Sequence, residues 1–163
     1  MNYRRTDSWV KGLRAELAFE DYVLSMGWSI EKSPSSEDRA RHIDYYVSNP
    51  VLKKKISFDV KKSSSSEEIW IEHTNVKGNT GWLRGESDCI AFYLDDTDRR
   101  FLVVDRDELL DFWNSVIDDN VTDKKKEAYL RAYQRKGRND LIAKITEEDL
   151  KSLVTTRTWE VLV

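Results

Sequence analysis

The chain has 163 residues, 39% of them hydrophobic and 35% charged, which fits one domain with a single core and a heavily charged surface. No apolar run approaches the ~20 residues that span a bilayer, no signal peptide is expected, and the single cysteine excludes an internal disulfide, so we expect a cytoplasmic, reducing setting and no membrane partner. The net charge of -3 and the pI of about 5.5 argue against a protein that coats DNA passively, because such proteins are normally basic.

Hydrophobic periodicity predicts a helix at the start of the chain, followed by a run of about five strands. The helix is expected to begin at Asp7 or Ser8 and to end at Ser25, just before Gly27. Its apolar stripe consists of four residues at helical spacing: Val10, Leu13, Leu17 and Leu24. Strands are expected among residues 28–31, 43–47, 56–62, 68–73, 89–94 and 101–104, with loops or turns at 33–39, 63–66, 76–85 and 95–99.

Helices are predicted again in the last third of the chain. Asp105, with Glu108 three residues later, has the pattern of a capping box, and Thr146 with Asp149 predicts a second helix start. The first of these helices has an apolar stripe formed by Leu109, Phe112, Trp113 and Val116. We therefore predict an α/β fold with a central mixed β-sheet of about five strands flanked by helices, in one domain over 1–163 with a core at about 7–117 and a C-terminal helical extension at about 118–163.

The segment 56–62 is the clearest strand, because apolar and polar residues alternate along it. With a side-chain period of two, the apolar set faces the core and the polar set faces outward together. The two sets are Ile56, Phe58 and Val60 on one side and Ser57, Asp59 and Lys61 on the other. An acid two residues before a lysine occurs three times in the chain, at Asp59, Asp123 and Asp149, so the spacing alone carries little weight. Only the first triplet lies on a strand, where residues two apart share a face.

Asp44 lies at the start of the preceding predicted strand, so Asp44, Asp59 and Lys61 can converge on one point. Phosphodiester hydrolysis needs such a point, because Mg²⁺ takes one or two carboxylates together with waters and the substrate phosphate. A nearby ammonium orients the attacking water and stabilises charge on phosphorus. We therefore predict a Mg²⁺ site, with Mn²⁺ as a substitute, formed by Asp44, Asp59 and the backbone carbonyl of Val60, with Lys61 as the catalytic ammonium.

An acid on one strand followed by acid-x-lysine on the next resembles the PD-(D/E)XK nuclease superfamily, whose first helix often contributes a glutamate. The matching residues here are Asp44, Asp59-Val60-Lys61 and Glu16. The resemblance implies a restriction-endonuclease-like core, DNA cleavage, and Glu16 as a further catalytic residue that binds the metal directly or through water. From the residues alone, Glu16 is equally a solvated glutamate at the edge of the apolar stripe.

The start of the chain also resembles the opening helix of archaeal-type Holliday-junction resolvases within that superfamily. The similar segments are 11–16 (Lys-Gly-Leu-Arg-Ala-Glu) and Gly27-Trp28, and the whole resemblance spans roughly residues 11–73. Ile43 stands where many superfamily members have proline. This resemblance implies branched or Holliday-junction DNA as the substrate.

Further candidates surround these strands. Glu72 shares a strand face with Trp70 and is expected beside Lys61, which it could orient; the alternative is a charged residue on a solvent face. Trp82, in a glycine-containing loop, either stacks on DNA or caps the core. The candidate DNA-contacting residues are Ser35, His42, Lys62, Lys77, Asn79 and Arg84.

The sequence thus favours a divalent-metal-dependent DNA endonuclease, with a homodimer expected because two strands must be cut. A site-specific double-strand endonuclease of the restriction or homing type is the first alternative. A non-catalytic DNA-binding or interaction protein that retains the nuclease fold is an alternative of another class.

Overall fold

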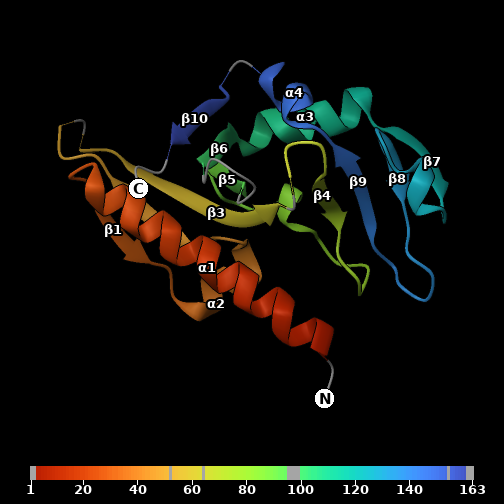
Figure 1. Cartoon of the computed structure of the whole chain (residues 1–163), viewed down its shortest axis with the longest axis horizontal. Coiled ribbons are helices and arrows are strands. Elements are labelled where there is room, and N and C mark those ends of the chain that lie inside the picture. The colour runs from red at the N-terminus through yellow and green to blue at the C-terminus, as the bar shows by residue number, and fades with distance from the viewer. Residues whose placement is uncertain (1–2, 52, 64, 95–99, 154, 161–163) are drawn as a thin grey trace.

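The structure is a computed structural model that describes residues 3–51, 53–63, 65–94, 100–153 and 155–160 (Figure 1). Two mixed sheets are built from these residues, together with four α-helices. The α/β class is as predicted, whereas the expected single sheet of about five strands is wrong, because the described strands divide into sheets of six and four. The predicted turn at 95–99 lies outside the described residues.

The six-stranded sheet has the order β1-β2-β3-β5-β6-β10, and only β3 and β5 run parallel to each other. Its strands are β1 (Ser29–Lys32), β2 (Tyr45–Ser48), β3 (Lys55–Ser63), β5 (Cys89–Leu94), β6 (Arg100–Asp105) and β10 (Arg157–Glu160). The strands predicted in the first two thirds of the chain begin and end within two residues of the observed bounds. The last strand, β10, has no counterpart in the prediction.

The four-stranded sheet has the order β4-β9-β8-β7, with β7 and β8 parallel. Its strands are β4 (Ile69–Thr74), β9 (Leu141–Ile145), β8 (Arg131–Tyr133) and β7 (Asp118–Thr122). The predicted helical extension at about 118–163 is therefore wrong over most of its length. The physical reason is visible in β9, where Ala143 and Ile145 belong to the hydrophobic core and the isoleucines favour an extended strand.

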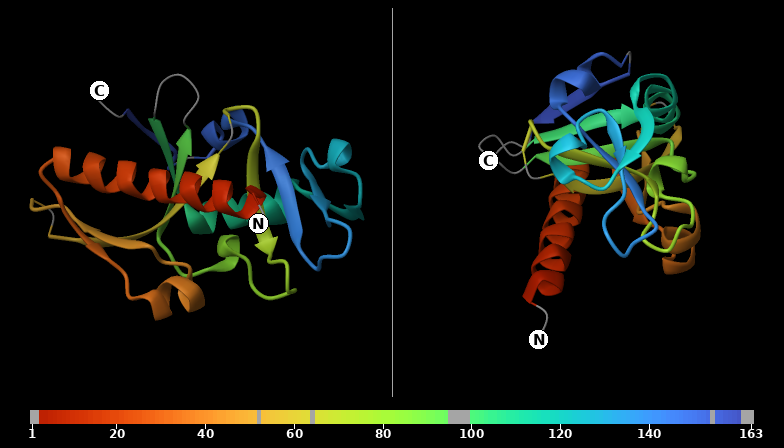
Figure 2. Two further views of the ribbon diagram at one scale, coloured as in Figure 1. Left: turned by 60° about the horizontal axis from the view of Figure 1, so that its bottom comes forward. Right: turned by 90° about the vertical axis from the view of Figure 1, so that its right-hand side faces the viewer.

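Helix α1 (Tyr3–Ser25) crosses one face of the six-stranded sheet, and its N-terminal half extends beyond the sheet (Figures 1 and 2). It packs on the sheet through Ala15, Phe19 and Val23, which are at most 1% exposed. Phe19 lies among four aromatic rings with centroids 5.1–6.2 Å away, those of Tyr45, Phe58, Phe101 and Trp159. The predicted leucine stripe lies on the other side, because the large aromatic side chain of Phe19 provides more packing area at the sheet.

The second core lies between the other face of this sheet, the four-stranded sheet and α3 (Arg106–Val116). Phe92 and Leu102 of the large sheet meet Ile71 of β4 and Trp113 of α3 there. Both predicted helix starts are confirmed. The Asp105 side chain accepts from the Glu108 N–H at 2.9 Å, and Thr146 and Asp149 form a reciprocal capping box at α4 (Glu147–Lys151).

The predicted loop at 33–39 is wrong, because α2 (Ser35–Arg41) occupies most of it. Pro34 stands at the N-cap, where its fixed φ suits a helix start, and Asp38 follows in the first turns. Within the part of the chain that is described, no helix has the length and apolar character needed to cross a membrane.

Two glycine substitutions provide a test of this architecture. A Cβ on Gly81 would lie 2.6 Å from the Glu72 carbonyl oxygen, because the turn before the 3-10 helix η1 (Trp82–Arg84) passes close to β4, whereas a Cβ on Gly12 of α1 meets nothing within 4 Å. We expect Gly81→Ala to lower the free energy of unfolding by roughly 1–3 kcal/mol and Gly12→Ala to raise it by up to ~1 kcal/mol. Denaturant titrations of both variants measure this, and a neutral Gly81→Ala contradicts the close approach.

Candidate active site

The antiparallel pairing of β2 with β3 brings Asp44 beside Asp59. Tyr45 is paired with Phe58, and Asp44, which directly precedes β2, donates its backbone N–H to the Phe58 carbonyl at 2.8 Å. The Asp44 side chain accepts from the Val60 backbone N–H at 2.8 Å, so the carboxylate is fixed against β3. Asp44 is 8% exposed and Asp59 is 1% exposed, so both predicted acids are buried rather than on an open polar face.

Lys61 lies at the outer side of these acids. Its Nζ is 3.1 Å from Asp59 Oδ1 and 5.5 Å from the ring centroid of Trp82, and its side chain is 31% exposed. Burial acts to lower the pKa of Lys61, but the charges of Asp59 and Asp44 outweigh it, so the pKa is raised. Lys61 is therefore a firmly charged ammonium with a path to solvent. The predicted convergence of Asp44, Asp59 and Lys61 is present.

The positions of the two carboxyls disfavour their ionised forms. Burial, followed by the negative charge of Asp59, raises the pKa of Asp44 to about 6. Burial also raises the pKa of Asp59, against the lowering effect of Lys61. Such a pair is poorly satisfied by protein groups alone and would be stabilised by a further positive charge.

An unpaired oxygen points to where that charge would bind. Asp59 Oδ2 is buried and has no hydrogen-bond partner among the described residues. The same residues contain no group of three or more His, Cys, Asp or Glu side chains arranged to hold a metal. Two carboxylates with a backbone carbonyl and waters remain a set that suits Mg²⁺, which seldom uses an all-protein cage.

Asp38 of α2 is a member of the site that the sequence did not reveal. Asp38 as a residue is exposed, but partial burial of its carboxyl and a hydrogen bond with Asp44 raise the pKa of Asp38 to about 6. The residue was hidden because 33–39 was interpreted as a loop. A proline followed by serines and acids is a recognisable helix start, and that signal would have placed Asp38 on a helix leading into Asp44.

Glu16 and Glu20 of α1 border the acids from the other side. Burial and then the charge of Asp44 raise the pKa of the half-buried Glu16, so the two carboxyls lie within electrostatic reach. Glu20 accepts a hydrogen bond from the Tyr45 hydroxyl at 2.6 Å, which ties α1 to the strand after Asp44. The structure thus places the predicted Glu16 at the margin of the site.

Glu72 lies near Lys61, but by a different route from the one expected. It is on β4 of the four-stranded sheet, whereas the neighbours of β3 are β2 and β5, so Glu72 approaches through the packing of two sheets and not from the next strand. Burial raises the pKa of Glu72, while Lys61 and the Trp82 backbone N–H act to lower it. Its predicted shared face with Trp70 is confirmed by the alternating burial of β4.

The candidate DNA contacts at the start of the domain differ from expectation in their local structure. His42 is not on a strand; it is the left-handed C-cap of α2, with φ 56° and with Nε2 3.2 Å from the Thr80 carbonyl oxygen. Ser35 is exposed as the first residue of α2. His42 therefore faces the 76–85 loop and does not share a strand face with Asp44.

The remaining candidates lie on β3 and in the loop after β4. Lys77 and Asn79 are exposed, and their backbone N–H groups donate to Asn75 Oδ1. The Arg84 guanidinium is occupied by hydrogen bonds to the His73 carbonyl at 2.8 Å and to Thr74 at 3.3 Å. Lys62 extends over the Tyr93 ring, 5.3 Å from its centroid.

Trp82 belongs to the core, which was one of the two roles expected for it. It is 7% exposed and packs edge-on against Phe92 with ring centroids 5.8 Å apart. The Trp82 ring also makes a cation–π contact with the Lys61 ammonium.

No protein-family model and no curated protein matches this chain. Among solved structures, the bacterial homing endonuclease I-Ssp6803I is similar, at 22% sequence identity and a TM-score of 0.47, with 61% of this chain and 70% of that chain covered. At this level the likeness carries no conclusion about the activity of this chain.

The buried carboxyls make the stability of the site dependent on pH. The pKa of Asp44 is raised from 3.8 to about 6 in the folded state, so ionising this carboxyl lowers the free energy of unfolding. The loss is complete above about pH 6 and absent below the unfolded-state pKa of 3.8. In metal-free buffer at about pH 7.5 we expect Asp44→Asn to raise the free energy of unfolding by roughly 1–3 kcal/mol, since each pKa unit corresponds to ~1.4 kcal/mol, and to lose this advantage near pH 4.

Denaturant titrations at the two pH values measure the effect. Asparagine keeps an oxygen that can accept from the Val60 N–H, so the substitution removes charge with little change in shape. Asp119→Asn, at an exposed position on β7, is the control and should be neutral at both pH values. An Asp44→Asn protein that is less stable than the parent at pH 7.5 would refute the electrostatic cost.

Proposed function

We propose that this chain is a divalent-metal-dependent DNA endonuclease that uses Mg²⁺, with Mn²⁺ as a substitute. The observation that carries the proposal is the Lys61 ammonium 3.1 Å from a buried Asp59, beside a buried Asp44. The second oxygen of Asp59 has no hydrogen-bond partner within the described part of the chain. Membership of the PD-(D/E)XK superfamily is part of the proposal and is supported by the β2–β3 register, which pairs Tyr45 with Phe58 and so brings Asp44 beside Asp59.

Asp44, Asp59 and the Val60 carbonyl are the groups that would hold the ion, with Glu16 acting through water. A bound Mg²⁺ supplies a Lewis acid for the phosphoryl group and lowers the pKa of a coordinated water. Lys61 orients the attacking water and stabilises the negative charge that develops on the phosphoryl oxygens. Because the two acids are buried, few water molecules compete with the carboxylates for the ion. Glu72 helps to position Lys61 by electrostatic attraction.

The substrate we favour is DNA with a branch or junction, by resemblance of the first helix. A site-specific double-strand endonuclease fits the same chemistry. A non-catalytic DNA-binding protein would not need Asp59 Oδ2 to be buried without a partner, since that arrangement costs stability and is justified by an ion.

The first test is cleavage. We expect the purified chain to cut at least one of four-way junction, nicked, linear duplex or single-stranded DNA with Mg²⁺, and EDTA to stop it. Lys61→Ala should lower the rate ~10²–10³-fold, the usual effect of removing one transition-state charge donor, and Asp59→Asn should abolish cutting. Lys55→Ala is the matched control on the same strand, because Lys55 forms an exposed ion pair with Glu31 away from the site.

Melting temperatures show whether each variant is folded. If the parent leaves every DNA form intact with both metals yet binds DNA, the catalytic proposal fails and the DNA-binding alternative replaces it. If Lys61→Ala cuts as fast as the parent, Lys61 has no role in the chemistry.

We also propose a homodimer formed through the exposed face of α1. Leu13, Leu17 and Leu24 share that face and are 38%, 51% and 57% exposed. Arg14 and Asp21, both exposed, flank it seven residues apart. An antiparallel second copy of α1 centred near Leu17 would bring Arg14 next to the partner's Asp21, so apolar and charged groups are both complementary to a second copy.

The dimer has its own test. Leu17→Glu should convert a dimer to a monomer in sedimentation or light-scattering measurements at micromolar concentration, because it buries a charge in the apolar stripe. Val121→Glu, at a position 48% exposed on β7 of the four-stranded sheet, should leave the dimer intact. A parent protein that is monomeric under these conditions would rule out the α1 dimer.

A further inference from the structure

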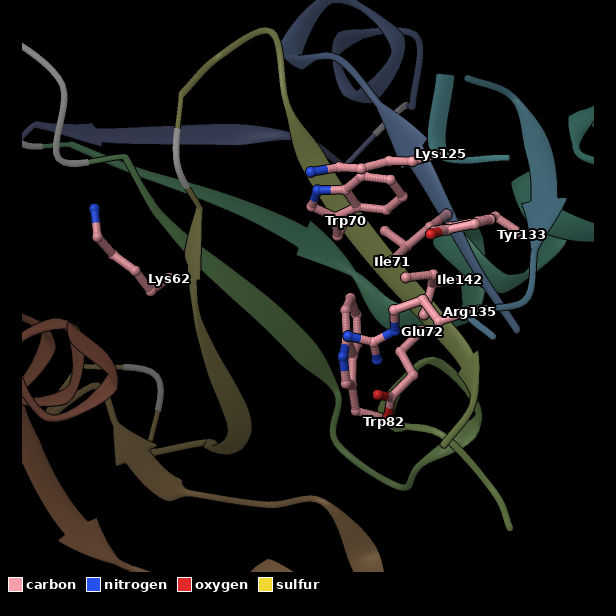
Figure 3. Close-up of a pocket in the computed structure, with 9 residues that line it drawn as sticks. All are labelled: Lys62, Trp70, Ile71, Glu72, Trp82, Lys125, Tyr133, Arg135 and Ile142. Atoms are coloured by element: carbon pink, nitrogen blue, oxygen red, sulfur yellow. The ribbon is translucent and has the colours of Figure 1, made fainter. Parts of the chain in front are cut away.

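A pocket of about 540 Å³ opens on the outer face of the four-stranded sheet, beside the candidate active site (Figure 3). Its floor is made by Trp70 and Glu72 of β4 and by Ile142 of β9 and Tyr133 of β8, where Ile142 is paired with both Glu72 and Tyr133. The volume lies within the ~300–1,000 Å³ of typical ligand pockets. This face therefore has a hollow of ligand size where a purely structural sheet would have a flat solvated surface.

The pocket combines aromatic rings with cations. The Trp70 and Tyr133 ring centroids lie 6.0 Å apart, with 43° between the ring planes, and Lys125 Nζ lies 5.9 Å from the Trp70 ring centroid. Figure 3 shows Lys125 beside the Trp70 ring. Arg135 is held in place by the fully buried Asp140, with NH2 2.5 Å from Oδ2. Lys125 and Arg135 bring two cations to this face beside one acid, Glu72, although the chain as a whole has a net charge of -3; Lys62, which also lines the pocket, extends over the Tyr93 ring. Such a combination favours a ligand with both aromatic rings and negative charge.

Two residues connect this pocket to the site of hydrolysis. Trp82 lines the pocket and also lies beneath the Lys61 ammonium, with 5.5 Å between ring centroid and Nζ. Glu72 lines it and interacts electrostatically with Lys61. A polymer whose phosphate lies at Lys61 would therefore place a neighbouring unit of the same chain at the pocket.

We infer that this pocket binds a nucleotide adjacent to the scissile phosphate, with its base against Trp70 and Tyr133 and its phosphate beside Lys125. Bases within a duplex are stacked on one another and offer only their edges, so a base that lies against an aromatic ring must be unpaired. The inference deepens and rests on the proposed function, because it assigns that site a substrate class: DNA with unpaired nucleotides next to the cut, such as a branch, flap or gap.

The experiment measures DNA binding without turnover, so that it does not depend on cleavage. Dissociation constants are measured in Ca²⁺ and in EDTA for two DNAs, a splayed duplex with unpaired arms and a fully paired duplex of the same length. Trp70→Ala and Lys125→Ala are each expected to weaken binding of the splayed DNA about 10-fold, consistent with the usual loss of one stacked base or one well-placed cation. Binding of the paired duplex should change less than 3-fold, a threshold of about 0.6 kcal/mol.

Matched variants control for fold and for general charge. Trp70→Phe keeps an aromatic ring and should bind as the parent does. Lys126→Ala removes an exposed cation from the position next to Lys125, outside the pocket lining, and Tyr129→Ala removes an aromatic residue that is 46% exposed and bonded to Asp149; both should leave the splayed DNA bound. Melting temperatures confirm that each variant is folded.

The outcomes separate this inference from the proposed nuclease activity. Equal weakening on both DNAs means that the surface binds paired duplex and overturns the nucleotide subsite, as does no weakening on either DNA. If the parent cuts DNA with Mg²⁺ and the pocket variants bind normally, the nuclease proposal stands and the subsite is lost. If no DNA is cut but the variants lose splayed-DNA binding selectively, the subsite stands and the nuclease proposal is lost.

Discussion

The burial of Asp44 and Asp59 next to each other is the constraint on which the rest of the site depends. Two neighbouring carboxyls in a poorly solvated position repel each other, and burial alone already favours their neutral forms. The fold offsets this with the Val60 N–H on Asp44 and the Lys61 ammonium on Asp59. One oxygen of Asp59 is still left without a partner. The register of two strands fixes where the carboxyls meet, and a cation bound there would reduce their repulsion.

The strand period made this part of the structure predictable. Alternation in β3 was enough to separate Asp59 and Lys61 from Phe58 and Val60, because successive side chains of any strand point to opposite faces. The same applies to the caps of α3 and α4, which are formed by residues three apart. These features need no knowledge of distant contacts, and the sequence predicted them correctly.

Features that depend on tertiary packing were not predictable in this way. The leucines of α1 and the buried set around Phe19 both recur at helical spacing, and only the sheet decides which of them is buried. The strands β7 and β8 are short, charged and paired in parallel, so their formation depends on partners far along the chain. Asp38 was not predicted for a related reason, since its contact with Asp44 depends on the position of α2 in the fold. The approach of Asp44, Asp59 and Lys61 and the strand β4 were therefore predicted, whereas Asp38 and the strands β7, β8 and β9 of the second sheet were not.

Trp82 is shared between the candidate active site and the outer pocket. One indole ring packs on Phe92 in the core, lies near the Lys61 ammonium and lines the outer pocket. If a ligand in the pocket shifts or fixes this ring, it also alters the free energy of binding at Lys61, and thermodynamic linkage makes that effect reciprocal. Two neighbouring units of a bound strand would then be recognised cooperatively, with the coupling carried by one side chain.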